Sequence, residues 1–284
     1  MSVYFCILGS GSKGNAALLK TPQANILIDA GFSPQELAQR LLGTGVSWES
    51  LDAIVLTHLH ADHFKRTCLK FCARFNVEFI CHNDHARRFE TFGSFKAMRR
   101  LGLVRTYGDE PFLIADSVCC HPVQVPHDSR PTFGFRFETS AACGRTMRLG
   151  YFADLGECDD AIASRMYGVD LLALEFNHDE KMQLKSGRHP SLIQRVMSAD
   201  GHLSNRQAAD VFRRVLESGH PAPKSLIQIH LSRECNSAQL AFESAQEVAF
   251  LAGAQTRIFS SRQEIRGTLH HMDADTLSSP SEAR

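Results

Sequence analysis

The sequence predicts an α/β fold in one domain. Short apolar segments of β-prone residues alternate along the chain with longer segments that carry apolar residues at helical spacing. The chain has 284 residues, of which 43% are hydrophobic, and this is enough to build a sizeable core. No internal repeat or linker divides the chain. We therefore expect one domain over residues 1–266 and a loose polar tail, with Ser and Pro, over residues 267–284.

Charge and cysteine content narrow the class of protein. The chain has 31 basic and 31 acidic residues, so a nucleic-acid partner would have to be held by a local patch. The nine Cys form no CxxC pair, and their odd number indicates reduced thiols in a cytoplasmic protein. We expect no signal peptide and no membrane partner, because a basic leader and a long apolar run are both missing. The oligomeric state stays open.

Three short strands are expected over residues 3–8, 16–19 and 26–28. The loop after the first strand reads GSGSKGN. Gly and Ser let backbone N–H groups approach an anion, and the Lys adds charge, so this loop is a candidate phosphate cradle. It lacks the order of a Walker A loop, and an ordinary hairpin turn is an equally good interpretation. The candidate substrate-binding residues of the loop are Ser10, Ser12, Lys13 and Asn15.

Asp29 ends the third strand, where a carboxylate needs a partner because burying an unpaired charge is costly. Orienting a metal-binding histidine is one such role, and capping the next helix is the alternative. That helix is expected over residues 33–42, with Ser and then Pro at its start. A short helix over residues 47–51 and a buried strand over residues 53–56 follow.

A dense run of metal-competent side chains follows that strand, in the segment LTHLHADHFK. Its four members are His58, His60, Asp62 and His63. The first two occupy alternate positions of an extended segment and can converge on one ion. The last two are expected at the first turn of a helix over residues 65–75, where a carboxylate suits the positive helix N-terminus. The spacing supplies half-shells for two adjacent ions, and a histidine-rich surface turn is the alternative.

The predicted helix over residues 65–75 places Cys68 and Cys72 on one face, which favours a role in the core. A buried strand over residues 77–81 comes next. The segment 87–105 then carries basic residues interleaved with Phe, a combination that suits a nucleic-acid backbone and unstacked bases. The alternative is an amphipathic helix whose rings belong to the core. We interpret the histidines at its start, His82 and His85, as surface residues.

Further strands are expected over residues 117–125, 132–138, 145–152, 170–174 and 224–229, with a helix over residues 159–166. Three of these strands end next to a metal-competent side chain. The three side chains are His127, Asp154 and His230. His121, on the same strand as His127, is the only local rival. One carboxylate between two cations can bridge both, and Asp154 is the candidate for that position.

The segment GHLSN opens a helix expected over residues 205–216. With Ser204 as N-cap, free N–H groups of the first turn, including that of Asn205, form a candidate anion site. His202 could bind a 5′-phosphate or protonate a leaving oxygen, and plain capping beside a surface histidine is the alternative. Other candidates near strand ends are Ser232 for substrate binding and Glu175 and His178 for supporting the ligands, with a buried ion pair as the alternative for Glu175.

The quartet, followed in order by a His, an Asp and a His at strand ends, resembles the signature of the metallo-β-lactamase superfamily. Within that superfamily, the stretches GSGSKGN, EFNHD, GHLSN and HLSRECN resemble the YycJ/WalJ branch. The similarity runs over nearly the whole chain, to about residue 260. The branch usually has Ala in place of Phe176 and Asn in place of Cys235, and these departures leave the ligand set intact.

The resemblance implies an αββα sandwich: two mixed sheets with helices on both outer faces and the metals at one sheet edge. It also implies a nuclease, namely a 5′-to-3′ DNA exonuclease with a role in mismatch repair, which favours DNA over RNA as substrate. The resemblance also implies that seven residues of this chain bind the metals. They are His58, His60, Asp62, His63, His127, Asp154 and His230.

The chemistry of these residues agrees with hydrolysis. Two cations roughly 3.5–4 Å apart can share a hydroxide that attacks a phosphodiester in line. We assign the first ion to His58, His60 and His127, the second to Asp62, His63 and His230, and the bridge to Asp154. Donors that are all N or O fit Zn²⁺ or Mn²⁺. Asp62, which could orient the hydroxide, and His202 are the expected catalytic residues.

The same ligand set also suits other two-metal enzymes. A hydrolase of a small ester, thioester, lactone or cyclic phosphate is therefore the alternative function. The basic segment 87–105 and GHLSN favour nucleic acid over these substrates. A binding protein with a degenerate site is disfavoured because the ligand set is complete.

Overall fold

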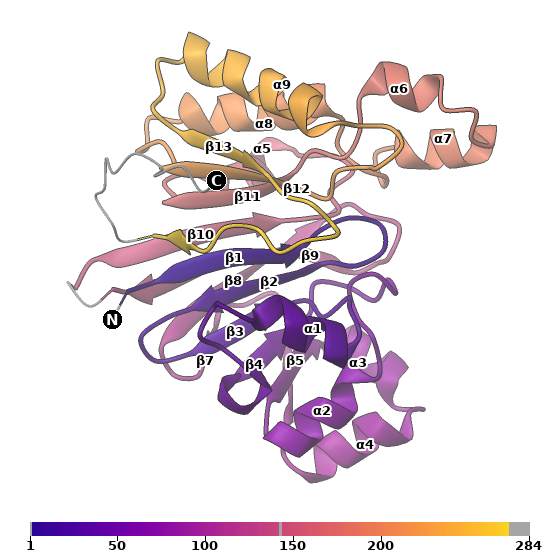
Figure 1. Ribbon diagram of the computed structural model, residues 1–284, viewed down its shortest axis with the longest axis vertical. Coiled ribbons are helices and arrows are strands. Elements are labelled where there is room, and N and C mark those ends of the chain that lie inside the picture. The colour runs from indigo at the N-terminus through magenta and orange to yellow at the C-terminus, as the bar shows by residue number, and fades with distance from the viewer. Residues whose placement is uncertain (1, 142–143, 273–284) are drawn as a thin grey trace.

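The computed structural model describes residues 2–141 and 144–272. Two seven-stranded sheets lie face to face, and helices cover the outer side of each sheet (Figure 1). Both sheets are mixed, because each contains parallel and antiparallel neighbours. The predicted αββα sandwich is therefore confirmed.

The first sheet is built from the N-terminal part of the chain and one short C-terminal strand. Its order is β14 (His270–His271), β1 (Tyr4–Gly9), β2 (Ala16–Lys20), β3 (Asn25–Ile28), β4 (Ala53–Val55), β5 (Glu78–His82) and β6 (Val104–Tyr107). The strands from β3 to β6 run parallel, so their carboxyl ends meet at one edge of the sheet.

The second sheet is built from the rest of the chain. Its order is β13 (Arg257–Ser260), β12 (Ser225–Ile229), β11 (Leu171–Glu175), β10 (Thr146–Phe152), β9 (Thr132–Ser140), β8 (Val118–Val125) and β7 (Phe112–Ile114). Here the strands from β10 to β13 run parallel, and the longer strands β8 and β9 pair antiparallel.

Strand alternation explains why helices cover both outer faces. Successive side chains of a strand point to opposite faces of its sheet. In β1, Phe5 and Ile7 pack into the core between the sheets, whereas Cys6 and Leu8 pack under the helices. Because both faces are apolar, each sheet needs a second cover, and the amphipathic helices supply it.

The helices divide between the two sheets in chain order (Figure 1). The first sheet carries α1 (Pro34–Leu41), α2 (Cys68–Phe75), α3 (Asn83–Phe89) and α4 (Gly93–Arg100), with a 3₁₀ turn, η1 (Trp48–Ser50). The second sheet carries α5 (Asp160–Ser164), α8 (Asn205–Leu216) and α9 (Ala238–Leu251). Two short helices, α6 (Glu180–Leu184) and α7 (Pro190–Val196), project past the end of this sheet. No helix of the described residues is long and apolar enough to cross a membrane.

One local prediction is wrong. The helix expected from residue 65 begins at Cys68, and Asp62 and His63 lie in a turn before it. The His63 N–H donates to the His60 carbonyl, and the Lys65 N–H donates to Ala30, so the segment is tied to the end of β3. A helix N-terminus therefore does not explain the carboxylate of Asp62.

The segment 87–105 also differs from the nucleic-acid interpretation. Phe89 and Phe95 are buried in the core beneath α3 and α4, so their rings cannot stack on bases. Three of the basic residues have acidic partners: Arg87 pairs with Asp84, Arg99 with Glu90 and Arg105 with Glu78. The core alternative is therefore correct for these rings.

Two further differences concern histidines. His85, interpreted as a surface residue, is buried, and its Nε2 donates to the Pro131 carbonyl over 2.8 Å. The pair His270–His271, inside the expected tail, forms β14 and pairs with β1. The first sheet thus extends past residue 266, and residues 273–284 of the expected tail lie outside the described residues.

Candidate metal centre

Strand ends from both sheets meet at one edge of the sandwich. Asp29 follows β3, Asp154 follows β10 and His230 follows β12. All three have positive φ, of 62°, 52° and 57°. Residues with a Cβ rarely adopt this left-handed conformation, and such local strain concentrates at functional sites. The chain turns sharply at each of these strand ends, and each turn carries a polar side chain of the centre.

All seven side chains predicted as ligands gather at this edge in three overlapping groups. The groups are His58, His60 and His127; Asp62, His63 and His230; and His58, His63 and Asp154. Within each group, one ligand atom from every residue lies within 4.8 Å of the others. An Oδ2 atom of Asp154 lies 2.5 Å from Nε2 of His63 and 3.5 Å from Nε2 of His58. Asp154 therefore contacts both half-shells.

The donor types and the unpartnered histidine nitrogens of this centre fit two divalent cations. The buried Nε2 atoms of His58 and His230 have no hydrogen-bond partner in the described part of the chain. Burial lowers the pKa of His58 well below its ordinary value, and the neutral imidazole is the form that binds metal. The donors are all nitrogen and oxygen, as hard or borderline divalent ions require.

Buried carboxylates give the centre a surplus of negative charge. Burial alone would lower the pKa of His63, but Asp154 and Asp29 outweigh it and raise this pKa to about 10. The pKa of His230 is likewise raised well above its ordinary value, since Asp154, Asp62 and Glu175 outweigh burial. The centre thus attracts positive charge, which metal cations supply when they bind.

Asp29 holds one of the candidate ligands in place. Its Oδ2 lies 2.7 Å from Nδ1 of His63, and its Oδ1 accepts from the Thr57 N–H over 2.9 Å. The Thr57 hydroxyl donates to the same carboxylate. With Nδ1 engaged by Asp29, the Nε2 atom of His63 is the one that faces Asp154. This is the arrangement by which a carboxylate orients a metal-binding histidine.

Glu175, at the end of β11, joins two histidines behind the centre. Its Oε1 lies 2.8 Å from Nδ1 of His202 and 2.9 Å from Nδ1 of His230. Its Oε2 accepts from the backbone N–H groups of Leu155 and Leu203. Burial would raise the pKa of this carboxyl, but the two histidines outweigh it and lower the pKa to about 2. These contacts make Glu175 a supporting residue for both rings.

His202 lies outside the three groups above and forms a fourth candidate group with Asp154, Glu175 and His230. Its ring centre is 5.0 Å from that of His127 and 5.1 Å from that of His230. Nδ1 lies 3.3 Å from Oδ1 of Asp154, in addition to its contact with Glu175. Burial would lower the pKa of His202, but these two carboxylates raise it to about 9.

The loop GSGSKGN divides into buried and exposed residues. Ser10 Oγ accepts from the His230 N–H over 2.8 Å, and Asn15 Nδ2 lies 2.9 Å from Nε2 of His63. The Asn15 N–H also donates to the Asp62 carbonyl. Ser12 and Lys13 are exposed. Half of this predicted cradle therefore builds the walls of the centre, and half faces solvent.

At the start of α8, where an anion site was predicted, most of the backbone N–H donors already bond to protein acceptors. Ser204 and Gln207 form a reciprocal capping box, and the Asn205 N–H donates to the His178 carbonyl. The Asn205 side chain pairs with Asn236 over 2.8 and 2.9 Å. Three of the first-turn donors are thus unavailable to a ligand, which speaks against a phosphate site there.

The remaining candidates, Ser232, His178 and His121, belong to none of the three ligand groups. The Ser232 hydroxyl accepts from the Cys235 N–H, and the side chain is half-buried. His178 is buried beside Ser204 and belongs to none of the ligand groups in the described residues. His121, the local rival of His127, lies away from these groups and contacts Cys119 over 3.4 Å.

Sequence reasoning missed Asp128, which borders the first ligand group. Its Oδ1 lies 3.2 Å from Nε2 of His60 and 3.3 Å from Nε2 of His127. The only signal was its position directly after a candidate ligand, in PHD at the end of a strand. A residue next to a ligand in sequence need not have its side chain near the ligand group, so spacing alone could not select Asp128.

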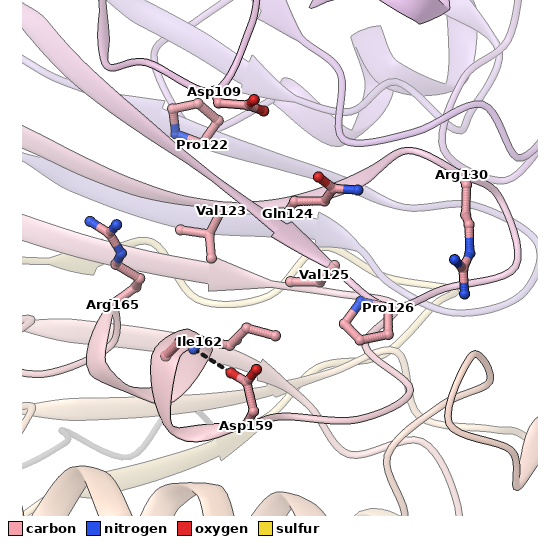
Figure 2. A pocket seen from close by; sticks show the side chains of 11 residues that line it. Asp109, Pro122, Val123, Gln124, Val125, Pro126, Arg130, Asp159, Ile162 and Arg165 are labelled. Atoms are coloured by element: carbon pink, nitrogen blue, oxygen red, sulfur yellow. Dashed lines mark hydrogen bonds between the residues drawn. The ribbon is translucent and has the colours of Figure 1, made fainter.

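A cavity of about 590 Å³ runs along β8 (Figure 2). Apolar side chains form part of its wall, and Arg130 and Arg165 stand on opposite sides of it. Pro126, which lines the cavity, directly precedes His127. A second cavity shares Gln124 and Arg130 with it and adds two more arginines, Arg87 and Arg88. The two cavities share part of their walls, and four arginines line them together with Asp84, Asp109 and Asp159.

The facing sheets and the histidine–aspartate centre at their edge define a metal-dependent hydrolase of the metallo-β-lactamase fold. The chain belongs to the beta-lactamase superfamily, because the family model described as the beta-lactamase superfamily domain matches residues 24–231.

Two relatives are similar over most of the chain. The exodeoxyribonuclease WalJ of Streptococcus pneumoniae is 28% identical over 245 residues, which is 84% of this chain and 84% of the relative. The exodeoxyribonuclease YycJ of Bacillus anthracis is 26% identical over 254 residues, which is 87% of this chain and 89% of the relative. The expected resemblance to the YycJ/WalJ branch is confirmed.

Solved structures agree on the fold. The metallo-β-lactamase fold protein YhfI from Bacillus subtilis superposes with a TM-score of 0.65 at 14% identity, covering 94% of this chain and 99% of its own. Zinc-bound PqqB from Methylobacterium extorquens superposes with a TM-score of 0.64 at 13% identity, covering 94% and 100%. At these identities the likeness concerns the fold alone.

Proposed function

We propose that the protein is a two-metal DNA exonuclease that degrades its substrate from the 5′ end, serves DNA repair and acts in the cytoplasm. The observation that carries the proposal is the pair of ligand groups joined through Asp154, with His202 beside them. The relatives WalJ and YycJ are named exodeoxyribonucleases, which supports DNA as the substrate.

We assign the first cation to His58, His60 and His127, and the second to Asp62, His63 and His230, with Asp154 shared between them. Bound Zn²⁺ or Mn²⁺ would supply an activated water and would neutralise charge on the phosphate. The side chain of Asp62 is 23% exposed, and that of Asp154 is 2% exposed. Asp62 is thus open enough to orient the attacking water as well as to hold a cation.

His202 is the proposed proton donor to the leaving oxygen. Glu175 and Asp154 engage its Nδ1, so Nε2 is the atom left for the substrate. Its side chain is 13% exposed, which gives a substrate access to one edge of the ring. A hydrogen-bonded histidine in this position can supply a proton as the phosphodiester bond breaks.

We assign contacts with the substrate backbone to side chains near the centre that are exposed or half-buried. Lys13 and Ser12 in the loop before β2 and Ser232 after β12 are the candidates. Ser10, Asn15, Ser204 and Asn205 are engaged inside the protein, so we assign them to the architecture of the site. The two cavities along β8 suit the continuing DNA strand, since Arg88 and Arg165 line them and phosphates attract guanidinium groups.

An assay on end-labelled oligonucleotides tests the proposal. Single-stranded DNA with a 5′-phosphate, incubated with protein and added Mn²⁺ or Zn²⁺, should yield mononucleotides released from the 5′ end. RNA of the same sequence, a thioester and a lactone are the comparison substrates. His60→Ala should abolish cleavage, whereas His220→Ala, at an exposed site, should not. Rapid hydrolysis of the thioester or lactone with intact DNA would refute the nuclease assignment.

A further inference from the structure

The two ring nitrogens of His60 face different partners. Nδ1 lies 3.3 Å from Nε2 of His127, inside the first ligand group. Nε2 lies 3.2 Å from Oδ1 of Asp128, outside that group. A neutral imidazole carries a hydrogen on one nitrogen and a lone pair on the other. A carboxylate at Nε2 therefore selects the form in which Nδ1 carries the lone pair.

Asp128 is itself held from the other side by a helix of the neighbouring segment. Its Oδ2 forms an ion pair with Nε of Arg195, on α7, over 2.7 Å. The same two segments are joined at Arg130, which pairs with Asp200 over 2.5 Å, and at His127, whose Nδ1 lies 2.9 Å from the Gly201 carbonyl. Contacts at three points thus hold the loop after β8 against residues 195–201.

We propose that Asp128 is a positioning residue of the metal centre: it accepts the Nε2 hydrogen of His60 and thereby presents Nδ1 to the first cation. Arg195 fixes the carboxylate in the orientation that this contact needs. Side chains in this role are typically worth 10–100-fold in metal affinity, because a free ring loses both its orientation and its protonation preference. The contacts of Asp128 with Arg195 and with His60 connect α7 to the first ligand group.

The inference rests on the metal-binding part of the proposed function and does not depend on the substrate. A competing role for Asp128 is that of a direct ligand, because its Oδ1 also lies 3.3 Å from Nε2 of His127. The two roles predict different effects of replacing the Asp128 carboxylate with an amide. Asn at position 128 still accepts a hydrogen bond from Nε2 of His60, whereas it replaces a charged ligand poorly.

Titration of metal-free protein with Co²⁺, followed by the visible absorption of the bound ion, tests the proposal. Asp128→Ala should weaken binding at one of the two sites about 10–100-fold and change the absorption bands of that site. Asp128→Asn should recover most of this loss. Asp200→Ala is the matched control, because this aspartate also pairs with an arginine across the two segments but touches no ligand. Its Co²⁺ affinity should equal that of the wild type.

Each other outcome has a defined meaning. Wild-type Co²⁺ affinity and spectrum in Asp128→Ala would overturn the proposal, and so would an Asp128→Asn variant as defective as Asp128→Ala. If Asp128→Ala fails to fold by circular dichroism, Arg195→Gln replaces it and should show a smaller loss in the same direction; no loss there overturns the proposal as well. Wild-type protein that binds no Co²⁺ would instead refute the metal centre itself.

Discussion

Glu175 holds His202 through a 2.8 Å contact between Oε1 and Nδ1, which leaves Nε2 of the ring as the atom that can meet a substrate. The same carboxylate engages His230, one of the candidate ligands. The position of the proposed proton donor is thus set by the residue that also supports the metal centre. His202 is outside the two proposed half-shells but shares a candidate metal group with Asp154, Glu175 and His230. Metal content and kcat measured together therefore separate a role in metal binding from a role in proton transfer.

His202→Ala should lower kcat about 10²–10⁴-fold while metal content stays at the wild-type level, since a positioned acid contributes an effect of this size. Steady-state kinetics and elemental analysis of the same preparation measure both quantities. His220→Ala, with an exposed side chain, is the control for histidine loss. A His202→Ala protein that has lost metal would mean that the ring is a ligand and not a proton donor.

Asp154→Asn should reduce bound metal from two ions per chain to one or fewer. The carboxylate contacts both half-shells, at 2.5 Å from His63 and 3.5 Å from His58, and an amide is a poor bridge between two cations. Elemental analysis after dialysis checks the stoichiometry. Asp210→Asn, half-exposed on α8, should retain both ions. Two ions in Asp154→Asn would contradict the bridging assignment.

Removing metal with a chelator should lower the melting temperature by about 5–10 °C. A cation present at 100 times its Kd stabilises the folded state by about 2.7 kcal/mol, and each kcal/mol shifts the melting temperature of a protein this size by about 2–4 °C. The buried carboxylate of Asp154 is the physical reason, because it would lose the cations that it is proposed to share. Calorimetry with and without chelator measures the shift, and re-adding Mn²⁺ or Zn²⁺ should reverse it.

His85 should make the protein less stable in mild acid. Burial lowers its pKa from the ordinary 6.5 to about 4, so between these values the unfolded chain binds a proton that the folded chain does not. Stability is therefore fully present above pH 6.5 and falls by up to about 3 kcal/mol as the pH drops toward 4.

Urea unfolding at pH 8 and at pH 5 tests this expectation. His85→Gln keeps a donor for the Pro131 carbonyl but does not titrate, so its stability should fall less between the two pH values than that of the wild type. Equal pH dependence in the two proteins would show that His85 is not the responsible group.

The parts of the centre that could be predicted are those set by local spacing. His58 and His60 converge because they alternate along one extended segment after β4, and this follows from strand geometry alone. His127, Asp154 and His230 were found because the resemblance implies a His, an Asp and a His in this order, and each follows a recognisable apolar strand. The resemblance to a known family supplied the layer arrangement of the fold, and the structure confirms it.

Other features escaped because their signals were weak or misleading. The helix α9 was not predicted, since the apolar residues in AQLAFESAQEVAFL are spread around the helix rather than gathered on one face. The helix expected from residue 65 starts at Cys68 because backbone contacts with Ala30 and His60 hold the preceding turn. The core position of Phe89 and Phe95, by contrast, was the interpretation that the sequence favoured for these rings, and the structure confirms it.

The sequence alone determined the types of donor and their order along the chain, because strand periodicity and the spacing of His and Asp are local properties. Only the tertiary structure decided what surrounds them. Asn15 against His63, Glu175 against His202 and Arg195 against Asp128 join residues 27 to 67 positions apart, and Asp154 against His63 joins the two sheets. Such contacts depend on how two sheets close on each other, and the free energy that favours closure comes from the buried core rather than from the polar residues it brings together.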